Sequence, residues 1–214
     1  MENKEILKQH INSYKNAIIE IINNNSNALV SDDLLSLIRK PPPDSMDNIK
    51  TKFLSLAKKN EMVLNTDSLD KTLDNYRNSL EKSILPLTKL RIEKLEEIIN
   101  NTELNNKEVI KITKKDLNEI NKEIKKVFKA SLKKSYTIIL NEMNSIFDKV
   151  DKEMLDSIKQ EINKYLNSNY EKQLLENFDI KILVKDTILI NNIKESSERY
   201  IFTLNNSRLL NKDL

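Results

Sequence analysis

The side chains that most often carry catalysis or bind metals are scarce in this chain. His10 is the only histidine, and the chain contains no cysteine. Without a cysteine or a second histidine, His10 can nucleate neither a zinc site nor a histidine-based catalytic pair. We interpret it as a partly buried or surface side chain beside an apolar stripe. The sequence therefore predicts no metal and no cofactor.

The carboxylates lie among lysines three or four positions away. Glu96, Glu97, Asp148, Asp151 and Glu153 are examples. This spacing is typical of solvated pairs on helices, and a carboxylate active site would instead need a pocket that shifts pKa values. Phosphate-binding loops require glycine, of which the chain has none. We expect a protein that is not an enzyme and takes no small-molecule substrate.

Charge is nearly balanced and evenly mixed. The chain has 36 basic and 33 acidic residues, which gives a net charge of +3. The densest lysine run, at 125–134, recurs at helical spacing and is interpreted as a solvated flank, so we expect no sequence-specific nucleic-acid binding. The first ten residues are too polar for a signal peptide, and no window approaches the roughly 18 apolar residues of a membrane span. These patterns predict an intracellular protein without a membrane partner.

The missing glycines also bear on the fold. An average chain of this length would carry roughly 15. Glycine supplies the positive-φ positions of tight turns, and all four prolines lie at or before Pro86. Apolar residues make up 38% and charged residues 32%, which favours narrow apolar seams flanked by charge. The sequence predicts an all-α protein with short N-terminal helices and long coiled-coil helices.

Residues 1–65 are predicted to form a helical head. A helix from residue 4 should end at the asparagine-rich run 23–27, and a second should follow Ser31 and stop at the prolines 41–43. A third should run from residue 44 or 45 to about 60, before an extended link at 62–65. The head is predicted to pack against an equivalent hairpin of a partner, with inward-facing side chains Ile11, Ile18, Leu34, Ile49, Phe53 and Leu56. All of these except Leu34 are assigned to the predicted partner interface.

Residues 66–166 are predicted to form a coiled-coil stalk with breaks near 86 and at 100–106. A single helix over 107–166 would be roughly 90 Å long, which requires partner helices to cover its seam. Residues 167–214 are assigned to a C-terminal helix and a tail that docks a partner or is partly disordered. The predicted stalk interface is Leu73, Leu80, Leu117, Ile124, Leu132, Ile139, Met143 and Ile146, and the tail-docking residues are Arg208, Leu209 and Leu210.

Residues 37–100 resemble one known family. The order is "IRKP" at 38–41, an amphipathic helix centred on Phe53, "VLN" at 63–65, and a capped helix that carries "TKLR" at 88–91. This order resembles the Nsl-one (Mis-fourteen) subunit of the kinetochore MIND complex, also called the Mis-twelve complex. The similarity covers about a third of the chain, and such families carry no rigid motif.

The resemblance implies a scaffold subunit at the kinetochore, in the nucleus. Such a subunit pairs most closely with a Dsn-type partner, and its complex links inner centromere-bound proteins to the outer, microtubule-binding layer. In some members of the family, the C-terminal tail docks outer kinetochore proteins, although this tail shows no matching motif. Two other classes stay open: a coiled-coil subunit of another cytoskeletal, spindle-pole or tethering complex, and a membrane-associated helical bundle.

Overall fold

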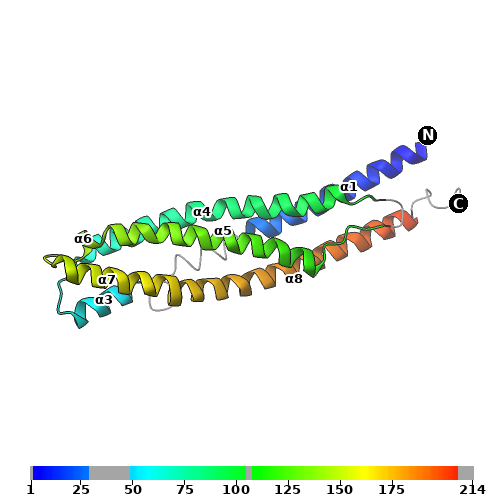
Figure 1. Ribbon diagram of the computed structural model, residues 1–214. Coiled ribbons are helices and arrows are strands. Elements are labelled where there is room, and N and C mark those ends of the chain that lie inside the picture. The colour runs from blue at the N-terminus through cyan, green and yellow to red at the C-terminus, as the bar shows by residue number, and fades with distance from the viewer. Residues whose placement is uncertain (1, 29–48, 105–107, 207–214) are drawn as a thin grey trace. The chain divides into compact units, whose positions relative to one another are not determined.

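The computed structural model describes residues 2–28, 49–104 and 108–206, and within them every regular element is a helix (Figure 1). The predicted all-α class is therefore confirmed for this part of the chain. The helices are α1 (Glu2–Ala28), α3 (Ile49–Lys59), α4 (Thr66–Asn101), α5 (Lys114–Asn141), α6 (Met143–Ile146), α7 (Lys152–Tyr165), the π-helical turn η2 (Leu166–Tyr170) and α8 (Glu171–Asn206).

The chain divides into two compact units, and each is built from segments that lie far apart in the sequence. Unit 1 consists of Met1–Leu29, Thr88–Glu123 and Ile182–Leu214, and unit 2 consists of Val30–Leu87 and Ile124–Lys181. Helices α4, α5 and α8 are each divided between the two units, so that one part of each helix belongs to unit 1 and the other to unit 2. These units do not coincide with the predicted division at residues 65 and 166.

The core of unit 1 is formed by α1 and the unit 1 parts of α4, α5 and α8. The Tyr14 ring stacks on Tyr200 with ring centroids 4.2 Å apart. The Tyr14 hydroxyl lies 2.6 Å from the Ser197 hydroxyl and accepts a hydrogen bond from the backbone nitrogen of Ile110 at 3.1 Å. Tyr14 thus joins α1 both to α8 and to the segment that precedes α5.

The core of unit 2 is rich in aromatic side chains. Tyr76 and Tyr136 lie with ring centroids 6.3 Å apart, and both meet Tyr170 edge-on. The Tyr76 and Tyr170 hydroxyls lie 2.8 Å apart. Phe53 on α3 stacks against Phe147, with centroids 5.7 Å apart. Phe53, Tyr76, Tyr136, Phe147 and Tyr170 are all buried in this core.

The first helix is longer than its sequence predicts. α1 continues through the asparagine-rich run to Ala28, so the predicted end near Asn23 is wrong. Asn25 and Ser26 are buried within unit 1, and the Asn25 side chain donates a hydrogen bond to the Lys185 carbonyl at 3.0 Å. Within this run, α8 supplies Asn25 with a hydrogen-bond partner that the local sequence does not reveal. The predicted helix after Ser31, with Leu34, lies outside the described residues.

The predicted break near Pro86 is wrong, because the helix that contains this residue is continuous. α4 is one helix from Thr66 to Asn101, and Pro86 is exposed on its surface. Because proline has no N–H, the carbonyl four residues before it loses its helical donor, and on the solvent side that carbonyl can bond to water, which lowers the penalty of the lost hydrogen bond. The predicted break after residue 100 is confirmed, because α4 ends at Asn101.

The predicted single helix over 107–166 is wrong. α5 begins at Lys114, and helical structure is interrupted between α6 and α7. There Phe147 forms an antiparallel bridge with Leu64, Lys149 takes a left-handed φ of 56°, and Asp151 caps α7 by accepting a hydrogen bond from Met154 at 2.9 Å. The same bridge confirms the predicted extended link at 62–65. The predicted helix within residues 167–214 is also confirmed, since α8 runs from Glu171 to Asn206.

Candidate partner-binding surface

The predicted interface residues are placed inside the chain's own packing. Twelve of the thirteen seam residues are no more than 1% exposed, while Ile11 is half-buried. Apolar side chains with so little exposed area are already covered by neighbouring helices of the same unit. Their contact with a partner stays a prediction, and it would require this packing to open. The buried twelve are Ile18, Ile49, Phe53, Leu56, Leu73, Leu80, Leu117, Ile124, Leu132, Ile139, Met143 and Ile146.

The predicted tail-docking residues Arg208, Leu209 and Leu210 lie outside the described part of the chain. Helix α8 ends at Asn206, two positions before Arg208. The candidates for a partner surface are therefore the apolar side chains that are exposed on the described helices.

An exposed apolar face lies on the unit 1 part of α8. Leu183, Val184 and Ile188 are 67%, 53% and 42% exposed. Residues four apart share one side of a helix, and Leu183 adjoins them one position before Val184. We call these three residues the α8 face. The opposite side of the same stretch is buried, through Ile182, Asp186 and Leu189.

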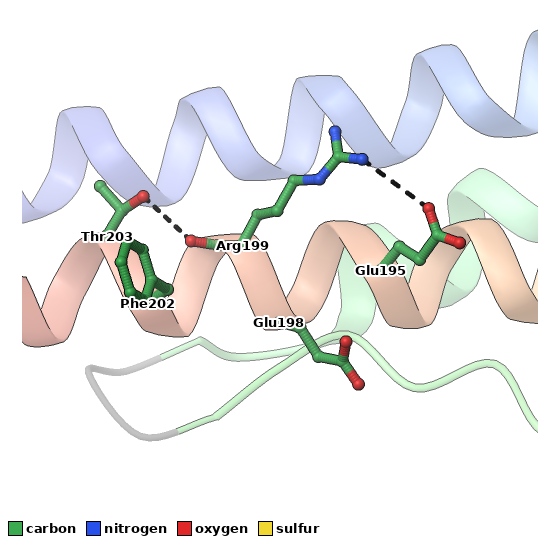
Figure 2. A pocket seen from close by; sticks show the side chains of 5 residues that line it. All are labelled: Glu195, Glu198, Arg199, Phe202 and Thr203. Atoms are coloured by element: carbon green, nitrogen blue, oxygen red, sulfur yellow. Dashed lines mark hydrogen bonds and ion pairs between the residues drawn. The ribbon is translucent and has the colours of Figure 1, made fainter.

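A second exposed group lies near the C-terminal end of α8. Figure 2 shows Glu195, Glu198, Arg199, Phe202 and Thr203 around a shallow, open depression on this helix. Phe202 is 70% exposed, and Arg199 lies 3.7 Å from Glu195 in an ion pair. All five side chains come from α8, and two of them, Glu195 and Arg199, also line a neighbouring depression together with Glu20 of α1. The depression is open and combines one large apolar side chain, Phe202, with charged and polar neighbours.

The carboxylates considered for catalysis occupy surface positions. Glu97, Asp148, Asp151 and Glu153 are exposed, and Glu96 is half-buried. Asp151 serves as the helix cap of α7. Among residues 2–28, 49–104 and 108–206 there is no group of three or more His, Cys, Asp or Glu side chains arranged to hold a metal ion.

The helices of the described ranges are interrupted by charge too often to resemble membrane spans. α8 carries the largest exposed apolar side chains, but charged residues interrupt it at intervals of a few positions. None of the helices in the described ranges combines the length and the apolar character that crossing a bilayer requires.

Sequence reasoning missed a buried polar group in unit 1. Arg91 on α4 is fully buried, and its terminal nitrogens donate to Asp186 at 2.8 Å, Asn121 at 3.0 Å and Asn25 at 3.3 Å. Asn121 in turn donates to the second Asp186 oxygen at 2.6 Å. We call these four residues the polar layer. Each interrupts an otherwise apolar seam of its helix, which is the signal that could have revealed it.

The hydroxyl groups of two tyrosines, one in the interior of each unit, have raised pKa values. Burial raises the pKa of the Tyr136 hydroxyl in unit 2, and the nearby Glu171 carboxylate adds to that rise. Burial likewise raises the pKa of Tyr200 in unit 1, with Tyr14 as the second cause. Both phenols are therefore protonated and uncharged at neutral pH, as packing residues should be.

Comparisons with protein-family models, with curated proteins and with solved structures found no match to this chain. The resemblance of residues 37–100 to a kinetochore subunit therefore stays an expectation drawn from the sequence.

Proposed function

We propose that this chain is a non-enzymatic helical subunit that works by binding other helical proteins. The observation that carries the proposal is the α8 face, where Leu183, Val184 and Ile188 stand in solvent on a chain whose other apolar seams are mostly covered. Neighbouring exposed apolar side chains of this kind mark sites of protein contact. A helix of a partner subunit would cover them as adjacent helices cover the rest of α8.

The finer proposal is a scaffold subunit of the kinetochore complex that links inner centromere-bound proteins to the outer microtubule-binding layer. Its support is the order of residue types in 37–100. In this role the partners are other helical subunits, foremost one of the Dsn type, together with outer kinetochore proteins. A coiled-coil subunit of a spindle-pole, cytoskeletal or tethering complex is the alternative with the same helical character.

The α8 face is tested by the substitution Val184→Asp, with Val63→Asp as its matched control. Val63 is 72% exposed in unit 2, so both variants place a carboxylate on a solvent-exposed valine and should fold. We expect Val184→Asp to reduce the recovery of co-purifying subunits at least tenfold, because it would bury a charge in an apolar contact. Equal recovery with both variants would remove the α8 face from the partner interface.

The identity of the complex is tested separately, in dividing cells of the source organism. We expect the tagged full chain to concentrate at centromeres and to co-purify with three other helical subunits. Recovery of spindle-pole or vesicle-tethering subunits instead would establish the alternative. Recovery of the chain alone, in quantitative mass spectrometry of native complexes, would contradict both.

A further inference from the structure

The polar layer is the least expected feature of unit 1, because a charged side chain is rarely buried so completely. It draws one residue from each of the four helix segments of the unit: Asn25 from α1, Arg91 from α4, Asn121 from α5 and Asp186 from α8. The four side chains meet through hydrogen bonds of 2.6–3.3 Å. Arg91 is the centre of the group, since it contacts the other three.

We propose that the polar layer sets the register of the four helix segments of unit 1. The layer lowers the free energy of one helix alignment relative to the shifted alignments. It does not raise the stability of the unit against unfolding. This inference is independent of the proposed function, because it concerns how the chain selects its own packing.

The energetics of buried ion pairs favour this role over a stabilising one. Taking an arginine and an aspartate out of water costs about as much as their attraction returns, and apolar residues of similar volume often do as well or better. The layer is also imperfect, because Arg91 Nε finds no hydrogen-bond acceptor among the described residues. A group of this kind adds little stability, yet it strongly penalises any arrangement that separates its members.

The neighbouring positions show why a shift would be penalised. One turn of helix is about 5.4 Å, and one turn from each layer residue the seams are apolar. A slip of α8 by one turn would therefore place Arg91 against isoleucine or leucine, and the buried guanidinium would lose its carboxylate. The apolar layers alone discriminate weakly, since Leu and Ile side chains substitute for one another with small changes in packing. These flanking residues are Ile22, Leu87, Leu95, Leu117, Ile182 and Leu189.

The test compares single substitutions with replacement of the whole layer in the full-length chain. Asp186→Leu leaves the Arg91 charge buried without its carboxylate, and we expect the Tm to fall by about 10 °C. The fourfold variant Asn25→Leu, Arg91→Met, Asn121→Leu, Asp186→Leu removes every buried polar group of the layer. We expect it to melt at or above the wild-type Tm.

Register is read from amide signals and hydrogen exchange. The wild-type chain should give one set of ¹⁵N–¹H peaks, whereas the fourfold variant should give doubled or broadened peaks for unit 1. Its unit 1 amides should also exchange at least tenfold faster despite the higher Tm. A fourfold variant with one sharp set of peaks and wild-type exchange would overturn the proposal. A fourfold variant that melts well below wild type would overturn it too, because the layer would then serve stability.

A surface ion pair on the same helices is the matched control. Lys94 on α4 lies 3.6 Å from Glu123 on α5, with both side chains exposed by about half. The double substitution Lys94→Met, Glu123→Leu should leave the number of peaks and the exchange rates of unit 1 unchanged. Doubled peaks in this control would show that loss of any interhelical ion pair loosens the unit, and the assignment to the polar layer would fail.

Discussion

At the scale of single residues, the start of α5 is held by reciprocal hydrogen bonds between Thr113 and Asp116. The Thr113 hydroxyl and backbone nitrogen donate to Asp116 Oδ2 at 2.7 and 2.8 Å, and the Asp116 backbone nitrogen donates to the Thr113 hydroxyl oxygen at 3.2 Å. This arrangement satisfies backbone donors that would otherwise lack partners at a helix N-terminus. The side-chain hydrogen bond first, and the backbone hydrogen bond second, lower the pKa of Asp116 below its ordinary 3.8.

A pH dependence follows from the direction of that change. Because the folded-state pKa is lowered, the stabilisation by ionised Asp116 is complete above pH 3.8 and is lost as the pH falls through the lower folded value. Urea unfolding of wild type and Asp116→Asn should therefore differ at pH 5.5 and converge toward pH 3. A difference that stays constant over this range would show that the carboxylate charge is irrelevant to the cap.

Packing of the aromatic core in unit 2 is tested with Phe53→Ala. Phe53 is fully buried against Phe147, so we expect the free energy of unfolding to fall by about 3–5 kcal/mol. Leu54→Ala on the same helix is the control, since Leu54 is 46% exposed, and it should cost less than about 1 kcal/mol. Chemical denaturation followed by circular dichroism measures both, and similar losses would contradict the assigned burial.

Individual seam residues could be predicted from helical spacing, but the pairing of side chains within the polar layer could not. Ile124, Leu132 and Ile139 recur at helical intervals, and all three are buried. Arg91 lies within a helix rich in charge, where an arginine is ordinarily solvated. Its burial depends on Asp186, which is 95 residues away in the sequence. No local pattern contains that partner.

At the scale of elements, the turn between α6 and α7 shows where periodicity fails as a guide. The apolar spacing continues through Ile146 and Val150, which is why the sequence predicts one helix there. The chain leaves the helix because Phe147 bridges to Leu64 and Asp151 caps the next helix. The bridge joins residues that are distant in the sequence, so local spacing does not reveal it. An aspartate such as Asp151 is also common on the surface of a helix, so its presence alone does not mark a helix start.

Because Lys149 in this turn has a left-handed backbone, we expect glycine substitutions at two lysines to change the free energy of unfolding in opposite directions. Lys149 has a φ of 56°, which glycine adopts without the penalty of a Cβ atom. Lys149→Gly should raise the free energy of unfolding by about 0.5–1 kcal/mol. Lys159→Gly, in the interior of α7, should lower it by about 1 kcal/mol. Thermal and urea melts of the two variants measure both, and a loss at Lys149 would show that its side chain makes a contact worth more than the strain.

At the scale of the whole molecule, the division into units could not be predicted from the sequence. The boundaries expected at 65 and 166 follow breaks in composition, whereas the observed units cut through α4, α5 and α8. The helical content could be predicted because it depends on nearby residues, as could some helix limits, such as the start of α4 at Thr66 and its end at Asn101. The grouping depends on contacts such as that between Tyr14 and Ser197, which local patterns do not encode.

A truncation separates the two units experimentally. A chain that stops after Lys181 retains all of unit 2 and loses the α8 part of unit 1, including Asp186 and Ser197. We expect hydrogen-exchange protection to persist at Tyr76 and Tyr136 and to vanish in α1, because Tyr14 and Arg91 would lose their partners. Loss of protection throughout the chain would show that the units fold only together.

The discontinuous make-up of unit 1 also governs its synthesis on the ribosome. Tyr14 and Ser197 are separated by 183 residues, so α1 emerges long before the helix that covers it. At about 5–20 residues per second, that delay is roughly 10–40 seconds. Throughout it, the nascent α1 lacks the neighbours that cover Ile18 and Ile22 in the folded chain. We therefore expect α1 to remain without its native contacts until the α8 part of unit 1 has been synthesised.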